Sequence, residues 1–311
     1  MRENESLEHV ILLWLNEKKN YIKSSTYTYY LFEVENYIIP QLGALQMSDL
    51  NEKVIQNAVL YWQKQGGKEQ TPLKKSTVQN LAMLIKQFLR YAIREGYMEE
   101  HPINIRFIPA NQGKKKKVFS TQEQLAIINA IREEPSYRTF GILLCLNSGL
   151  RIGELCALRW EDFDLDNGII HINKTLQRIY DYNGTPKTRI IISTPKTSTS
   201  IREIPLSSKM MDVIKTMHEK NAGGYVLTNS SVYMEPRSFR KFYMDFLERH
   251  KIMPLNFHCL RHTFATRCIE NGSDYKSVSE ILGHTTINTT LNMYVHPQLE
   301  EKRKCVELLQ W

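Results

Sequence analysis

Apolar residues recur at helical spacing through the first 110 positions of the chain. Four stripes follow the spacing of three and four residues that places side chains on one face of a helix. The stripes span residues 7–14, 27–38, 54–62 and 81–91. Ser24-Ser25-Thr26 precedes the second stripe, and Pro40 and Gly43 follow it, as residues that start and stop helices do. We therefore expect residues 1–110 to form a small bundle of four amphipathic helices.

The pattern changes after residue 117. Ser120-Thr121 followed by Glu123 has the form of a helix start, and an apolar helix is expected over Phe140–Leu146. Three short isoleucine-rich runs predict strands. These runs are 168–172, 190–192 and 201–204, with Asn183-Gly184 as a hairpin turn. Helical patterns then return, which predicts a mixed α+β domain over residues 118–311.

The last fourteen residues carry a separate apolar stripe. Pro297 ends the preceding helix, and Leu299, Val306 and Leu309 recur at helical spacing before Trp311. We expect a tail helix over residues 298–311. It folds back on its own domain or packs on a neighbouring protomer.

Composition indicates the class of partner and argues against a membrane span and a zinc site. The 311 residues carry a net charge of +8, with pI near 9.1, which favours a polyanionic partner. The polar segment 111–117 supplies half of that charge through Lys114, Lys115, Lys116 and Lys117. No apolar run approaches the length of a membrane span, and the five cysteines show no zinc-ligand spacing. We expect a cytoplasmic protein with no membrane contact and reduced thiols.

Six residues with phosphate-binding or proton-transfer chemistry stand in a suggestive order. They are Arg151 in Gly-Leu-Arg-Ile-Gly-Glu-Leu, Lys196 in Thr-Pro-Lys-Thr, His258 and Arg261 in His-Cys-Leu-Arg-His, His284 after Leu-Gly, and Tyr294. Each alone is commonly structural: an arginine is usually a surface residue and a late tyrosine usually packs. Together they suit nucleophilic attack on a phosphodiester without a metal.

This arrangement resembles the tyrosine recombinase (phage integrase) family, whose signature is Arg…Lys…His-x-x-Arg…His…Tyr. All six positions are filled, and Ile39–Gly43 also looks like a turn of the integrase core-binding domain. The resemblance implies a mainly α fold with a small antiparallel β-sheet. It would comprise an α-helical, SAM-like core-binding domain (1–110), a basic linker (111–117) and a mixed α+β catalytic domain (118–311).

The chemistry of a phosphodiester assigns roles to the two arginines and the tyrosine. Arg151 and Arg261 would hold the non-bridging oxygens, which gain negative charge during attack. Tyr294 would attack phosphorus and form a 3′-phosphotyrosine. Its phenol has an ordinary pKa of about 10, so attack near neutral pH needs a base or the fields of the guanidinium groups.

The remaining candidates would move protons or support their neighbours. His258 is the better candidate for the base, and His284 would donate a hydrogen bond to a phosphate oxygen. His284 follows a helix C-terminus, where the macrodipole favours a protonated imidazole. Family resemblance makes Lys196 the general acid for the leaving oxygen; Lys187 shares its tetrapeptide but not the following Arg-x-Ile-Pro-Leu. Glu154 is expected to support a catalytic residue rather than act as an acid.

The resemblance also implies partners and leaves alternatives. We expect duplex DNA as substrate, with Lys114–Lys117 against phosphates. Self-association on DNA would give a tetramer at synapsis, with a possible accessory DNA-bending or directionality factor. No metal, ATP or other cofactor is expected. The first interpretation is a site-specific integrase of a phage or mobile element. The alternatives are a Xer-like chromosome or plasmid dimer resolvase, a type IB-like topoisomerase and a non-catalytic DNA-binding protein.

Overall fold

A computed structural model gives the fold in two compact units. One comprises residues 1–114 with 178–189, and the other residues 115–177 with 190–311. The described residues are 4–109, 117–181, 184–194, 198–219, 223–294 and 307. Most of the linker predicted over 111–117 therefore lies outside them, and its boundaries stay a prediction. So does the tail helix of residues 298–311, apart from position 307.

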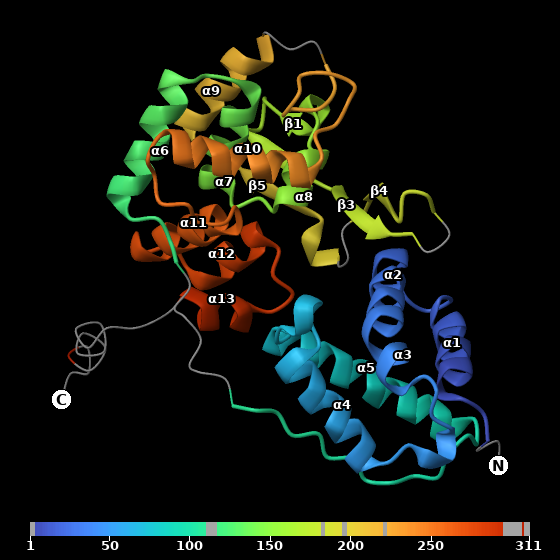
Figure 1. Ribbon diagram of the computed structural model, residues 1–311. Coiled ribbons are helices and arrows are strands. Elements are labelled where there is room, and N and C mark those ends of the chain that lie inside the picture. The colour runs from blue at the N-terminus through green and yellow to red at the C-terminus, as the bar shows by residue number, and fades with distance from the viewer. Residues whose placement is uncertain are drawn as a thin grey trace. The chain divides into compact units, whose positions relative to one another are not determined.

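Helices build the first unit (Figure 1). They are α1 (Leu7–Lys18), α2 (Ser24–Glu33), α3 (Ile39–Leu42), α4 (Glu52–Gln65) and α5 (Lys75–Arg94), with short 3₁₀ turns at Met47–Asp49 and Lys68–Gln70. Three predicted stripes lie on α1, α4 and α5, and the second runs from α2 into the turn that follows it. Trp14 of α1 and Phe88 of α5 are buried and pack edge to face at the centre of the core. The helical bundle expected from the sequence is confirmed.

Pro40 does not end the second helical segment, contrary to the sequence expectation. Between α2 and α3 the chain makes a π turn over Val34–Ile38, and the amide of Ile39 donates to the carbonyl of Val34, five residues earlier. A prolyl ring clashes with the carbonyl four residues before it in a regular helix. The wider turn accommodates the ring, so the helical path continues to Leu42.

The second unit is mainly helical, with eight α-helices among its described residues. They are α6 (Thr121–Glu133), α7 (Tyr137–Ser148), α8 (Ile152–Ala157), α9 (Ser208–Glu219), α10 (Pro236–Arg249), α11 (His258–Glu270), α12 (Tyr275–Leu282) and α13 (Ile287–Tyr294). Ser120 caps α6 through the capping box that the sequence predicted. No helix in the described part of the chain is long and apolar enough to cross a membrane.

Five short strands lie between α8 and α9 in the sequence. They are β1 (Phe163–Asp164), β2 (Ile169–Ile172), β3 (Thr175–Tyr180), β4 (Thr188–Ser193) and β5 (Arg202–Pro205). Of their residues, 178–180 and 188–189 belong to the first unit and the others to the second. β1, β2 and β5 form an antiparallel sheet in that order, with Ile170 opposite Ile204, and β3 pairs with β4. The sequence predicted β2, β4 and β5 but missed β1, which has two residues, and β3, where polar residues interrupt the apolar run. The mainly α fold with small antiparallel sheets is confirmed.

Packing within the second unit brings the C-terminal helices together (Figure 1). α11 contacts α7, α12 and α13, and α12 contacts both α13 and β5. The core beneath them is apolar, with Leu260 of α11 and Leu282 of α12 both fully buried. Segments far apart in the sequence therefore meet around the end of α12.

Candidate active site

Arg151 lies directly between two helices. α7 ends at Ser148 and is capped by Gly149, which has a left-handed backbone (φ 63°), and α8 begins at Ile152. A Cβ at Gly149 would lie 2.7 Å from the ring of Phe264, so the sharp turn needs glycine. The half-exposed Arg151 guanidinium donates through Nη1 to Glu154 (2.7 Å) and through Nη2 to the carbonyl of Gly283 (2.8 Å). These contacts fix a cation at the surface of the unit.

Arg261 is buried on α11, with 1% of its surface exposed. Its Nη1 donates to the carbonyl of Gly149 (2.8 Å), and its Nη2 donates to the carbonyl of Leu282 (2.6 Å). One guanidinium therefore joins the end of α7 to the end of α12. The structure therefore brings Arg151 and Arg261 to consecutive carbonyls of one chain segment, those of Gly283 and Leu282.

Arg202 is a member of this cluster that the sequence analysis did not select. Its guanidinium donates to both carboxylate oxygens of Glu154 (3.0 and 2.9 Å), and both side chains are almost fully buried. Burial raises the pKa of Glu154, but the hydrogen bonds and charge of Arg202, with the charge of Arg151, outweigh it and lower the pKa overall. Arg202 begins the Arg-x-Ile-Pro-Leu segment, which was the available signal.

Glu154 thus connects two arginines. It accepts hydrogen bonds from the guanidinium and the backbone amide of Arg151, in addition to those from Arg202. The guanidinium of Arg261 bonds the nearby carbonyl of Leu282, so three guanidinium groups gather at the end of α12, where the charges of Arg151, Arg202 and Arg261 all act on His284. This excess of fixed positive charge favours an anion.

The structure corrects the expected charge of His284. The helix dipole argument predicted an imidazolium, but guanidinium groups already bond the carbonyls at this end of α12, including Arg202 to Ile281 (2.5 Å). Burial, followed by the positive charges of Arg261 and Arg151, lowers the pKa of His284 to about 3. The imidazole is therefore neutral near pH 7, and it is the arginines that occupy the negative end of the helix.

His258 and Arg261 differ in exposure although three positions separate them on α11. His258 is the first residue of the helix and is exposed, whereas Arg261 is buried. The His258 ring lies across that of His262, with centroids 4.6 Å apart and planes 86° apart. His262 is buried. His258 is near enough to His284 to contribute to its lowered pKa.

Several predicted site residues are described only in part or not at all. Tyr294 is the last residue of α13, and its side chain is not among those described. Lys196 and Lys114–Lys116 lie outside the described residues. Lys117 is exposed, and its charge partly offsets the burial that raises the pKa of Cys259 on α11. The competing Lys187 belongs to the first unit, whereas Arg151, Arg261 and His284 belong to the second.

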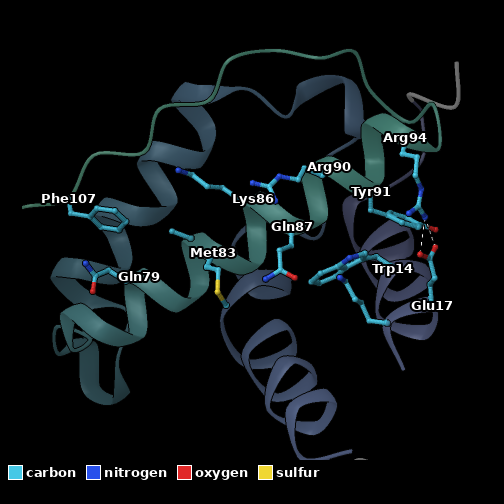
Figure 2. Close-up of a pocket in the computed structure, with 12 residues that line it drawn as sticks. Trp14, Glu17, Gln79, Met83, Lys86, Gln87, Arg90, Tyr91, Arg94 and Phe107 are labelled. Carbon is cyan, nitrogen blue, oxygen red and sulfur yellow. Dashed lines mark hydrogen bonds and ion pairs between the residues drawn. The ribbon is translucent and has the colours of Figure 1, made fainter. Parts of the chain in front are cut away.

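The first unit carries a groove that the sequence analysis did not predict. It has a volume of about 670 Å³ and runs along the exposed face of α5 to the end of α1. Figure 2 shows Lys86 and Arg90 on α5, with the linked pair Arg94 and Glu17 at one end of the groove. Among the described residues, no carboxylate forms an ion pair with Lys86 or Arg90. Lys86 and Arg90 therefore stand in the groove as uncompensated cations.

Comparison with known proteins covers both units. Residues 117–301 match the phage integrase family, and residues 6–63 match the N-terminal SAM-like domain of phage integrases. A tyrosine recombinase XerC-like protein of Caldanaerobacter subterraneus subsp. tengcongensis is 30% identical over 92% of this chain and 78% of its own length. The match to the phage integrase family, over residues 117–301, alone covers more than half of the chain.

Solved structures share the fold. The Tn1549 transposon integrase, in complex with a circular intermediate DNA, superposes with a TM-score of 0.80 at 19% identity and covers 98% of this chain and 99% of its own. A lambda integrase tetramer bound to a Holliday junction gives a TM-score of 0.67 at 17% identity, with 96% and 81% covered. The chain belongs to the phage integrase family and is a site-specific tyrosine recombinase.

Proposed function

We propose that the chain cuts and rejoins duplex DNA through a 3′-phosphotyrosine on Tyr294. The phenolic oxygen forms a bond to phosphorus while the bond from phosphorus to the 5′-oxygen breaks. The phenolic proton passes to a base, and the departing oxygen receives a proton from an acid. Rejoining reverses these steps, because the phosphotyrosine ester retains the energy of the broken phosphodiester.

The cluster of Arg151, Arg202 and Arg261 at the end of α12, where the three guanidinium groups donate to three successive carbonyls, is the observation that carries this proposal. A phosphodiester carries one negative charge and gains charge on its non-bridging oxygens during attack. Fixed guanidinium donors stabilise that charge without reorganising. They retain their protons near neutral pH, so the site supplies positive charge without a metal ion, and the tyrosyl ester makes ATP unnecessary.

The two histidines have different roles in this mechanism. His258 is exposed at the start of α11, where solvent reaches its ring, and it serves as the base for the tyrosine. His284 is half-buried and neutral, with its pKa lowered to about 3 mainly by burial and then by Arg261. A neutral imidazole bears one N–H group, which His284 uses to donate to a phosphate oxygen.

Lys196 serves as the general acid in this proposal. Family resemblance carries this assignment, since the residue lies outside those described. An ammonium group supplies the proton that the 5′-oxygen needs in order to leave as an alcohol. Glu154 keeps Arg151 in place through two hydrogen bonds and takes no part in proton transfer.

Duplex DNA is the proposed substrate, and both units contribute cations to it. Lys86 and Arg90 line the groove of the first unit, and Lys114–Lys117 span the boundary between the two units in the sequence. Lysine and arginine attract the phosphate backbone irrespective of base sequence. The Tn1549 integrase is bound to a circular intermediate DNA, and lambda integrase is a tetramer bound to a Holliday junction. We propose that this chain likewise assembles on DNA as a tetramer at synapsis.

The decisive experiment uses Tyr294→Phe, which removes one oxygen. A duplex with a nick beside the cleavage site traps covalent protein, because the short cleaved strand diffuses away. The wild-type protein is expected to form an adduct that survives denaturation, and the variant to bind the same duplex but form none. An adduct with the variant would mean that another tyrosine is the nucleophile.

Dimer resolution is the second candidate function, because a XerC-like relative is 30% identical to this chain. Both functions use the same chemistry and differ in the DNA sites joined. Sequencing of junctions formed in a cell carrying the protein distinguishes them. Junctions between an element and a chromosome indicate integration, whereas conversion of chromosome or plasmid dimers to monomers indicates resolution.

A further inference from the structure

We propose that Thr290 is a positioning residue that orients His284 and ties it to the helix carrying Tyr294. Thr290 lies on α13, one turn before Tyr294, and its side chain is fully buried. Its Oγ1 lies 2.8 Å from Nδ1 of His284. This proposal rests on the proposed function, since it gives a task to an imidazole placed in the recombination site.

The hydroxyl group of Thr290 selects one form of the imidazole. In the neutral ring, one nitrogen bears a proton and the other accepts a hydrogen bond. When Thr290 donates to Nδ1, the ring proton lies on Nε2, and that N–H is then a donor for a phosphate oxygen. If bound phosphate raises the pKa of His284 and the ring gains a proton, the hydroxyl rotates and accepts from Nδ1 instead. A methyl group in place of the hydroxyl can neither donate to Nδ1 of the neutral ring nor accept from Nδ1 of the protonated ring.

A backbone hydrogen bond also fixes the position of His284. The amide of His284 donates to the carbonyl of Ser279 in α12 (3.0 Å), while its ring bonds to Thr290 in α13. The imidazole is therefore held between the two helices, which pack against each other and against α11. A displacement of α13 would move Thr290 and release the ring. His284 is thus correctly oriented only when α13, the helix that carries Tyr294, is packed against α12 as in this structure.

Three variants test this role. Thr290→Val keeps the shape of the side chain and removes the hydroxyl, and Thr290→Ser keeps the hydroxyl. Thr289→Val makes the same change at the neighbouring position, where the hydroxyl faces Thr286 rather than His284. The measurements are single-turnover formation of the covalent adduct on nicked duplex and the dissociation constant for that duplex.

The net value of one hydrogen bond corresponds to about a tenfold change in rate, so Thr290→Val should cleave about tenfold more slowly with unchanged DNA affinity. Thr290→Ser should stay within about twofold of the wild type, as should Thr289→Val, since the hydrogen bond to His284 is intact in both. Equal rates for Thr290→Val and the wild type would overturn the proposal. So would a failure of serine to restore the rate.

A double-mutant cycle separates an effect through His284 from a general loss of packing. In a His284→Ala background, Thr290→Val should cause no further decrease, because the group it orients is absent. A further tenfold decrease would overturn the proposal. Nitrogen NMR of the wild-type imidazole gives a test that needs no variant: the ring proton is expected on Nε2, and a proton on Nδ1 alone would contradict the assignment. If the proposed function itself is wrong, the wild-type protein forms no adduct at all.

Discussion

The two units present their cations in opposite ways. On α5 of the first unit, Lys86 and Arg90 are exposed, and no described carboxylate pairs with them. In the second unit, Arg202 and Arg261 are buried and hydrogen-bonded to a carboxylate or to helix-end carbonyls. Solvated cations attract phosphate with little geometric selection, and salt screens them. Buried, fixed cations favour one arrangement of charge and act in a transition state.

We expect the largest effect from a substitution at Lys196, which tests whether proton transfer, and not charge alone, limits the rate of cleavage. Lys196→Ala should cleave normal DNA about a thousandfold more slowly, within the range for loss of a general acid. It should recover on a duplex whose 5′-bridging oxygen is replaced by sulfur, because a thiolate leaves without protonation. Single-turnover adduct formation on both duplexes measures this. Rescue of Lys187→Ala in its place would transfer the role to Lys187.

Arg261→Lys tests whether fixed geometry matters beyond charge. Lysine keeps the positive charge but lacks the planar fork that reaches the carbonyls of Gly149 and Leu282. Cleavage should fall about a hundredfold, as for loss of a fixed donor to a developing charge. DNA affinity should change little. Arg267→Lys makes the same change on α11, and a similar loss of cleavage there would mean that the fork of Arg261 has no special part.

Glu154→Gln should weaken folding through the buried charge network. Removing the charged partner of a buried arginine costs about 3 kcal/mol of the free energy of unfolding at neutral pH. The folded-state pKa of Glu154 is lowered, so its ion pairs stabilise the protein above the ordinary glutamate pKa and are lost as pH falls through the lowered value. The difference between variant and wild type should therefore shrink in acid.

Urea unfolding of the two proteins at neutral and acidic pH measures this prediction. The matched control is Glu161→Gln, because Glu161 forms exposed ion pairs with Arg159 and Lys174. That change should cost less than about 1 kcal/mol at either pH. An equally large loss for both variants would show that burial adds nothing to the pairing of Glu154.

We expect the smallest effect from substitutions in the groove of the first unit. Replacing Lys86 and Arg90 by glutamine should leave cleavage by bound protein unchanged but weaken binding to all duplexes alike. If each cation neutralises one phosphate, the slope of log affinity against log salt should decrease by about 1.8. The same two-charge change at Lys209 and Lys215, exposed on α9, is the control. Equal slopes for both pairs would remove the groove from the DNA interface.

Local sequence patterns predicted most of the helices. Short motifs identified Arg151, Arg261 and His284, and the structure brings these three together around the end of α12. The helical stripes of the first unit needed only spacing within one helix. These features depend on neighbours in the sequence, which is why the sequence alone predicted them.

Contacts between distant segments were not predictable in the same way. Arg202 bonds Glu154 across 48 positions, and nothing near Arg202 in the sequence indicates that its guanidinium is buried. The neutral state of His284 follows from burial and from several arginines contributed by separate elements. The dipole argument considered one helix, and it was wrong because tertiary packing placed other cations at that helix end.

The arginine contacts at the end of α12 have a consequence for recognising activity in related chains. Arg151, Arg202 and Arg261 donate to the three successive carbonyls of residues 281–283, which a helix otherwise leaves unsatisfied. They therefore cap the helix as well as hold charge. A descendant that no longer cleaved DNA would still need these arginines to keep α12 folded. Retained arginines alone would then be weak evidence of catalysis, whereas a retained Tyr294, the proposed nucleophile, would be strong evidence.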